Sequence, residues 1–252
     1  MIPPTSIDGT DITGATIDGT DVQEITVDGD VVFTAAQPSF GTVIDNFESG
    51  NLNNYITGSD SPQIVTSPVA EGGFAFEHEG PSSPRYSAKS NTGLNAYPTQ
   101  GRRFSNLLRV NSGSWGIGMA FGMPGGNNEG PFGAVTIAPS INEAAFFGVD
   151  SSGSTTFDDR KNVSVNGNQW YDAVVEWHDG SGSEPNNTIV WSLHEVDTSI
   201  DLTVNQGHTN TVTSGSVTFS DISGNTSFGF VDFTSSINLG YVDRILDLGP
   251  VS

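Results

Sequence analysis

Apolar and polar residues alternate along much of this chain, most clearly between Gln169 and Val196. Residues 169–178 and 188–196 read as two long strands joined by a polar loop at 179–187. Because successive side chains of a strand point to opposite faces, each of these strands has one apolar face. The residues on those faces are Tyr171, Ala173, Val175 and Trp177 in the first strand and Ile189, Trp191 and Leu193 in the second. The pattern predicts a β-hairpin at the centre of a packed sheet.

Strand-like runs separated by turn residues continue over most of residues 42–248, without a convincing helical period. The predicted strands are residues 42–47, 62–67, 73–79, 84–90, 102–111, 115–122, 132–138, 144–149, 155–165, 169–178, 188–196, 200–204, 215–221, 226–233 and 238–247. Their number suits two packed sheets of six or seven strands each. We therefore expect an all-β fold, a two-sheet antiparallel jelly-roll sandwich preceded by a short β-repeat segment.

The repeat lies in residues 5–33, where a unit of an apolar residue, Asp and Gly recurs every ten positions. Its three copies begin with Ile7, Asp8 and Gly9, with Ile17, Asp18 and Gly19, and with Val27, Asp28 and Gly29. Each copy predicts two short strands around an Asp-Gly turn, since Gly supplies the positive φ that such turns need. The segment has too few large apolar side chains to form a core alone. We therefore expect it to pair with another copy or another protein. A small meander packed on the main domain is the alternative.

These boundaries predict three parts: an attachment or oligomerisation segment at 1–36, a linker at 37–41 and the jelly roll at 42–252. Pro38 and Gly41 interrupt any strand in the linker.

Charge narrows the possible partners. The chain has 29 acidic and 8 basic residues, a formal net charge of -21, and its lysines are Lys89 and Lys161. Such a chain repels nucleic acids and anionic membranes, so we expect neither as a partner. A generically acidic protein and a protein adapted to molar salt both fit. Acidity with so little lysine favours the second, because a Debye length of about 3 Å at 1 M salt screens the self-repulsion.

Cysteine is absent, which excludes disulfides and thiolate chemistry. The first residues lack the basic and apolar regions of a signal peptide, and no apolar run is long enough to span a membrane. We expect a protein made in the cytoplasm without a signal peptide and without membrane insertion.

Four stretches resemble the concanavalin A-like lectin/glucanase (laminin-G-like) sandwiches. They are residues 44–55, residues 69–76, the hairpin that begins at Gln169, and residues 239–245. The amino-terminal repeats resemble short attachment segments of tailed-virus virion proteins. Together with the acidity, the chain resembles a structural protein of a haloarchaeal tailed virus. The resemblance implies that the first and last strands of the sandwich pair.

Catalytic chemistry has little support. Asp172 and Glu176 share one strand face with His178, and His194 lies on the corresponding face of the next strand. Sandwich glucanases hold two carboxylates close together on one strand, but Val174 interrupts that run here. The four histidines, including His78 and His208, lack metal-ligand spacing and are interpreted as surface residues. We expect no catalytic residues and treat a glycan hydrolase as the alternative.

Binding sites are more plausible. In sandwiches of this resemblance a calcium ion often lies where the first and last strands meet, which makes Asp45, Glu48 and Asp243 candidate ligands; no cofactor is required. Sugars stack on exposed aromatic rings and bond to amides in loops. The glycan-binding candidates are Trp115, Tyr97, Trp177, Asn127 and Asn128, although core packing is the competing explanation for each aromatic residue.

Three of the eight basic residues lie within eight positions, at Arg102, Arg103 and Arg109. We expect them to pair with carboxylates, either of a neighbouring copy or of the same domain.

The combined expectation is a virion surface protein, as a head turret, capsid decoration or tail fibre. Residues 1–36 would bind other virion proteins, and the chain would form a homo-oligomer, a trimer or a pentamer. The jelly roll would adhere weakly and multivalently to host surface glycans or surface-layer glycoprotein. A purely architectural capsid decoration protein remains the further alternative.

Overall fold

The chain forms two compact units, Met1–Phe40 and Gly41–Ser252. The structure, a computed structural model, describes the strands of the first unit and, in the second, residues 41–57, 62–79, 85–90, 98–111, 116–124, 130–202, 206–232 and 239–251. In these parts the chain is nearly all β.

The first unit contains three antiparallel strand pairs, one for each copy of the repeat. They are β1 (Ser6–Ile7) with β2 (Thr10–Asp11), β3 (Thr16–Ile17) with β4 (Thr20–Asp21), and β5 (Glu24–Val27) with β6 (Asp30–Thr34). The strands flank the Asp-Gly positions, as the turn pattern predicts.

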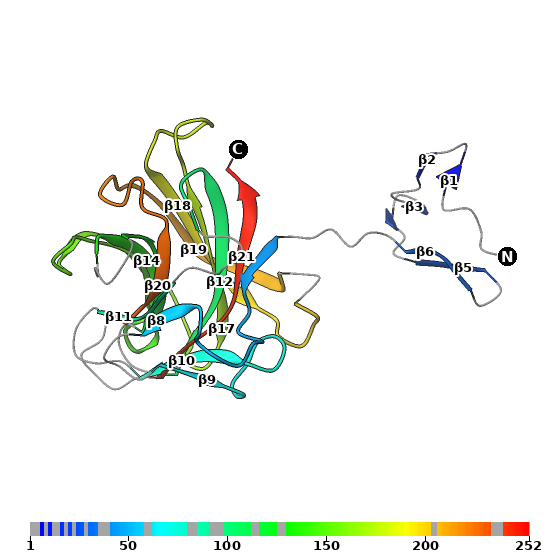
Figure 1. Ribbon diagram of the computed structural model, residues 1–252, viewed down its shortest axis with the longest axis horizontal. Coiled ribbons are helices and arrows are strands. Elements are labelled where there is room, and N and C mark those ends of the chain that lie inside the picture. The colour runs from blue at the N-terminus through cyan, green and yellow to red at the C-terminus, as the bar shows by residue number, and fades with distance from the viewer. Residues whose placement is uncertain are drawn as a thin grey trace. The chain divides into compact units, whose positions relative to one another are not determined.

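The second unit is a sandwich of two antiparallel sheets (Figure 1). The larger sheet has the order β19-β18-β17-β12-β21-β10-β9, and β7 pairs with β21 as its eighth strand. Its strands are β7 (Thr42–Asp45), β9 (Gln63–Val65), β10 (Ala75–Glu79), β12 (Arg102–Val110), β17 (Trp170–Trp177), β18 (Thr188–Val196), β19 (His208–Thr218) and β21 (Leu239–Pro250). The pairing of β7 with β21 confirms that the first and last strands of the sandwich meet.

The smaller sheet has seven strands in the order β16-β15-β14-β13-β20-β11-β8. They are β8 (Tyr55–Thr57), β11 (Arg85–Ser90), β13 (Ile117–Met123), β14 (Phe132–Ala138), β15 (Glu143–Val149), β16 (Thr155–Asn162) and β20 (Ser227–Asp232). A short 3-10 helix, η1 (Pro139–Ile141), connects β14 to β15.

Aromatic rings fill the space between the sheets. Phe76 of the larger sheet packs on Phe230 of the smaller, with ring centroids 4.4 Å apart. Phe121 contacts both Phe104 and Trp177, at 5.0 and 5.8 Å. Burying rings of this size supplies most of the hydrophobic stabilisation of such a domain.

The predicted hairpin is confirmed, and two neighbouring predictions are wrong. Strands β17 and β18 pair in register from Tyr171 opposite Glu195 to Trp177 opposite Ile189. Residues 200–202 form no strand, because Leu202 instead packs into a small apolar cluster over the outer face of the sheet. Strand β19 begins at His208 rather than near residue 215, and β8 was not predicted.

Candidate functional site

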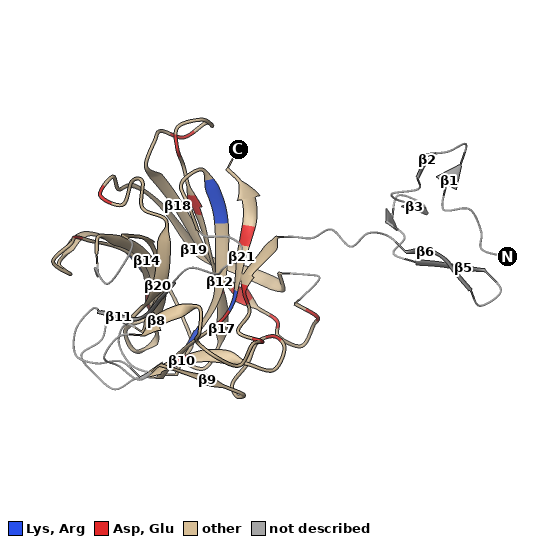
Figure 2. Ribbon diagram, viewed as in Figure 1, with Lys and Arg blue, Asp and Glu red and all other residues tan. Residues whose placement is uncertain are grey.

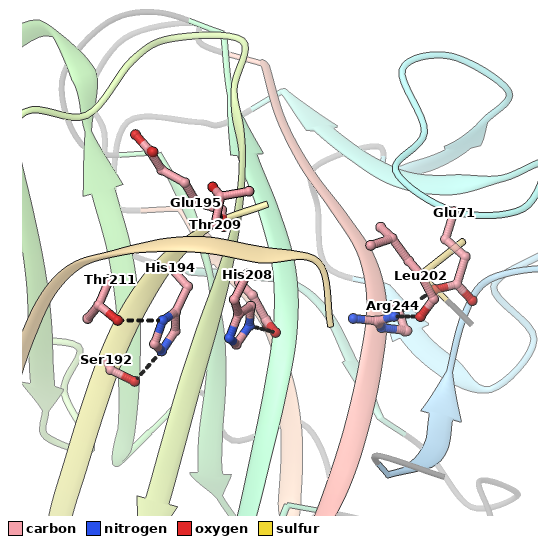
Figure 3. Close-up of polar contacts among 10 residues, drawn as sticks. Glu71, Ser192, His194, Glu195, Leu202, His208, Thr209, Thr211 and Arg244 are labelled. Carbon is pink, nitrogen blue, oxygen red and sulfur yellow. Dashed lines mark hydrogen bonds and ion pairs between the residues drawn. The ribbon is translucent and has the colours of Figure 1, made fainter. Parts of the chain in front are cut away.

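A polar cluster lies on the outer face of β17, β18 and β19, on the side away from the core. Asp172 is opposite His194 in register, and His194 is opposite Thr211 on β19. The alternation that turns Tyr171 and Ala173 into the core turns Asp172 outward. Figure 3 shows the side chains of Ser192, His194, His208 and Thr211 gathered there. We call Asp172, Ser192, His194, His208 and Thr211 the outer-face cluster.

Two imidazole rings form the middle of this cluster. His194 and His208 are stacked with centroids 4.1 Å apart and an angle of 2° between their planes. Nε2 of His208 lies 2.8 Å from Oδ2 of Asp172, within hydrogen-bond distance. Asp172 is fully buried, and its Oδ1 has no hydrogen-bond partner among the described residues.

His194 stacks on His208 and lies between two hydroxyl groups. Its Nε2 lies 2.8 Å from Oγ of Ser192 and its Nδ1 3.1 Å from Oγ1 of Thr211 (Figure 3). Burial lowers the pKa of His194, and the neighbouring His208 lowers it further, against the opposing effect of Asp172. A neutral ring has one donor and one acceptor nitrogen, so it orients both hydroxyl groups while leaving each with a free donor or acceptor site.

A buried ion pair fixes the loop beside the cluster. Arg244 is 1% exposed and donates to Oε2 of Glu71 at 2.9 Å and to the carbonyl oxygen of Leu202 (Figure 3). Burial raises the pKa of Glu71, and Arg244 opposes that rise. Leu202 packs with Leu107 and other apolar residues of the outer face, so this segment is held on the sheet by both apolar and ionic contacts.

The carboxylates of β17 do not form a hydrolytic pair. Asp172 and Glu176 are four residues apart on one strand, so their Cα atoms are about 13 Å apart at about 3.3 Å per residue, and their side chains bind partners on opposite sides of β17. Retaining hydrolysis needs carboxyl groups about 5 Å apart and inverting hydrolysis at most about 9.5 Å. Asp172 contacts His208, and Glu176 contacts Arg103 at 3.4 Å and lies 3.6 Å from His178. The pair therefore lacks the geometry of either glycosidase mechanism.

The predicted glycan-binding residues are not brought together in the described chain. Trp177 is fully buried against Phe121, so its ring cannot stack on a sugar at the surface, and that candidate is corrected. Tyr97, Trp115, Asn127 and Asn128 lie outside the described residues.

The predicted calcium ligands point to separate partners. Asp45 accepts from the N–H of Phe47 and the hydroxyl of Tyr55. Glu48 accepts from the N–H groups of Gly73 and Phe74. Asp243 accepts from those of Ala70 and Glu71. Among the described residues no three acidic, His or Cys side chains form a group suited to a metal ion, so these carboxylates do not share one site. Calcium binding itself stays a prediction.

Other predicted contacts have mixed outcomes. Arg102 pairs with Asp247, Arg103 with Glu176, and Arg109 lies over the ring of Tyr241, all within the domain. His78 and His178 are buried, not surface residues.

The structure does not test the prediction that residues 1–36 attach the protein to other virion proteins or to other copies. Ile7, Ile17 and Val27 lie in β1, β3 and β5, while the Asp-Gly positions 8–9, 18–19 and 28–29 lie outside the described residues.

Sequence reasoning aligned Asp172 with His194 but missed His208. Strand β19 has an extra residue at Thr209 and another at Val212, where its register with β18 shifts. Because of these bulges and the preceding loop, the strand face of His208 cannot be found by counting alternate residues along the sequence. The detectable signal was a histidine close before a strand that pairs with β18.

Neither the family models nor the curated proteins contain a match to this chain. Among solved structures, a xylan β-1,4-xylosidase from Bacillus halodurans matches with a TM-score of 0.53 and 8% identity, over 81% of this chain and 38% of the xylosidase. A carbohydrate esterase from a Shiga toxin-encoding bacteriophage matches with a TM-score of 0.47 and 12% identity, over 83% and 97% of the two chains. A carbohydrate-binding module, CBM66 from Bacillus subtilis, matches at 0.41 and 9%, over 79% and 95%.

The xylosidase match shows a shared fold, whereas the TM-scores of the other two matches are below 0.5. The second unit is an all-β sandwich of two antiparallel sheets, a fold that part of the xylosidase shares. The described residues contain no helix long and apolar enough to cross a membrane.

Proposed function

We propose that this protein is a virion surface structural protein of a halophilic tailed virus and that its sandwich adheres to host surface glycans or glycoprotein. Residues 1–36 would attach it to other virion proteins. The sandwich fold, the net charge of -21 and the three strand pairs of the first unit support this proposal. Turret, decoration protein and tail fibre are all compatible with it.

The outer-face cluster is the observation that carries the binding role. It presents partly exposed imidazole and hydroxyl groups on a rigid three-stranded surface. Sugar hydroxyls both donate and accept, so they suit neutral groups that do the same, fixed in position by a scaffold. The buried Asp172 and the stack with His208 keep the ring of His194 in place. The surface supplies orientation without a reactive pair of carboxylates, which favours binding over hydrolysis.

Purified full-length protein tests this role against a glycan array and immobilised surface-layer glycoprotein in 2 M KCl. The double variant S192A/T211A removes both hydroxyl groups and leaves both imidazoles. We expect affinity to fall at least about tenfold, because each hydrogen bond contributes on the order of 1 kcal/mol.

Ser183→Ala is the matched control, since Ser183 is exposed in the loop between β17 and β18. Equal binding by S192A/T211A and by the control would remove the cluster from the adhesive surface. Absence of binding by wild-type protein to any glycan or glycoprotein would favour a purely architectural decoration role. Release of reducing ends from polysaccharide would favour the hydrolase.

A further inference from the structure

The strands at the ends of the two sheet orders differ in how they are protected. Strands β9 and β8 are three residues each, too short to recruit another strand. Strand β16 carries Asp158, Asp159, Arg160 and Lys161, and charged side chains also discourage edge pairing. Strand β19 has eleven residues and no Asp, Glu, Lys or Arg. In the described part of the chain it pairs on one side only, with β18.

One half of β19 has a regular edge. The extra residues at Thr209 and Val212 distort the first half, and such bulges protect an edge by twisting it. From Thr213 to Thr218 the pairing with β18 is continuous, without a shift in register. This six-residue half therefore has neither charged side chains nor bulges to protect it.

The hydrogen bonds between β18 and β19 show which backbone N–H and C=O groups of β19 point away from β18. The N–H of Phe219 donates to the carbonyl of Asn187, so the residues of β19 that bond to β18 are odd-numbered in this half. Antiparallel ladders alternate, so the N–H and C=O groups of the even-numbered residues point away from β18. Those residues are Ser214, Ser216 and Thr218, and all three are exposed.

The charge at this side of the sandwich also permits contact between copies. Strand β16 lies beside β19, with Asp159 next to Gly215, and Oδ2 of Asp159 also accepts from Nε1 of Trp191 on β18. The charges of β16 cancel in two pairs, Arg160 with Asp158 at 2.7 Å and Lys161 with Asp159 at 2.6 Å. In a chain with a net charge of -21, the four charges of β16 sum to zero.

We propose that two copies of this protein associate through β19, pairing antiparallel from Ser214 to Thr218 with Ser216 opposite its own counterpart. A twofold axis at Ser216 lets each of the three even-numbered residues pair with its partner: 214 with 218, 216 with 216, and 218 with 214. The pairing joins the two larger sheets into one continuous sheet. It is independent of the attachment role of the first unit and of any glycan.

The absence of cysteine from the chain makes a direct test possible. Full-length S216C places a single thiol at the proposed axis, and S49C places one on an exposed loop after β7 as the control. We expect a short bismaleimide to convert S216C, but not S49C, to covalent dimer at micromolar concentration in 2 M KCl. Cross-linking of S216C at the level of S49C overturns the proposal.

Mass measured by light scattering provides a second, independent readout. Ser216→Pro removes an outward N–H while sparing the bonds to β18, and S216A keeps that N–H. We expect S216P to lower the average mass by a factor of about two relative to S216A, with an unchanged circular dichroism spectrum. If S216P and S216A have the same mass, pairing through this edge is excluded. Loss of particle incorporation without a change in mass would assign the edge to another partner and also overturn the proposal.

Discussion

Folding strongly disturbs the ionisation of Asp243. It is fully buried, and burial raises the pKa of its carboxyl group from 3.8 to about 7, despite hydrogen bonds from the N–H groups of Glu71 and Ala70 and the nearby Arg244. Its Oδ1 has no hydrogen-bond partner among the described residues. The folded state therefore binds a proton here more tightly than the unfolded chain does.

The stability contributed by Asp243 decreases as the pH rises. Because the pKa is raised on folding, the stabilisation from Asp243 is complete below about pH 4 and is lost as the pH rises to about 7. Asn at this position keeps an oxygen that accepts from Ala70 and Glu71 but carries no charge. We expect D243N to exceed wild type in unfolding free energy by roughly 2 to 4 kcal/mol at pH 8 and by little at pH 4. Denaturant titrations at several pH values measure this.

Asp221→Asn is the control, because it removes the same charge from an exposed position. A difference between D243N and wild type that stays constant from pH 4 to pH 8 would contradict the prediction. Calcium bound at Asp243 would compete with the proton, so adding calcium at pH 7 should narrow the difference if the ion binds there.

At the scale of elements, one side chain joins the two sheets at their rim. Trp191 of β18 is fully buried, and its Nε1 donates to Oδ2 of Asp159 on β16 at 3.1 Å. The same carboxylate pairs with Lys161. The indole thus contributes core packing and a polar contact between sheets.

Substitution of Trp191 separates these contributions. We expect W191A to cost about 3 to 5 kcal/mol through the cavity it leaves. W191F keeps an aromatic ring and loses the donor, so a smaller cost of about 1 to 2 kcal/mol is expected. Guanidinium unfolding of W191F, D159N and the double variant measures the coupling energy. A coupling energy near zero would show that the bond between Nε1 and Asp159 contributes nothing to stability.

Sequence alone predicted the elements whose alternation is uninterrupted. Residues 170–177 and 188–196 alternate without a bulge, and both strands lie within a residue of their predicted ends. Strand β19 was placed too late because its bulges at Thr209 and Val212 break the period that a sequence reveals. Leu202 suggested a strand because the sequence does not distinguish an apolar side chain of a strand from one that packs a loop onto the sheet.

The candidate site was predictable only in part, for the same reason. Asp172 and His194 become neighbours as soon as the hairpin register is known. His208 joins them through a loop that no periodicity describes. Trp177 was offered both to the core and to a sugar, and only three-dimensional packing decides between them.

At the scale of the whole molecule, net charge should control stability. Acidic residues occupy many separate strands and loops of the sandwich (Figure 2), so their repulsion is distributed rather than confined to one patch. We expect the melting temperature to rise between 0.1 M and 2 M KCl as the Debye length falls from about 10 Å to below 3 Å. Scanning calorimetry of the full chain measures it, and S216P serves to separate this effect from salt-dependent association. A melting temperature that does not change with KCl would contradict adaptation to high salt.

The pairing of β7 with β21 has a mechanical consequence. Any load carried from residue 40 enters the sandwich at Gly41 and Thr42, where Thr42 is paired with Asp247. Strand β7 holds to its neighbour through only residues 42–45, backed by the buried Ile44 and Phe47. Because Thr42 pairs near the carboxyl end of β21, a pull between residue 40 and the carboxyl end would separate this short strand one residue pair at a time. Strand β7 would therefore detach before the rest of the domain unfolds, while the hairpin of β17 and β18 stays folded.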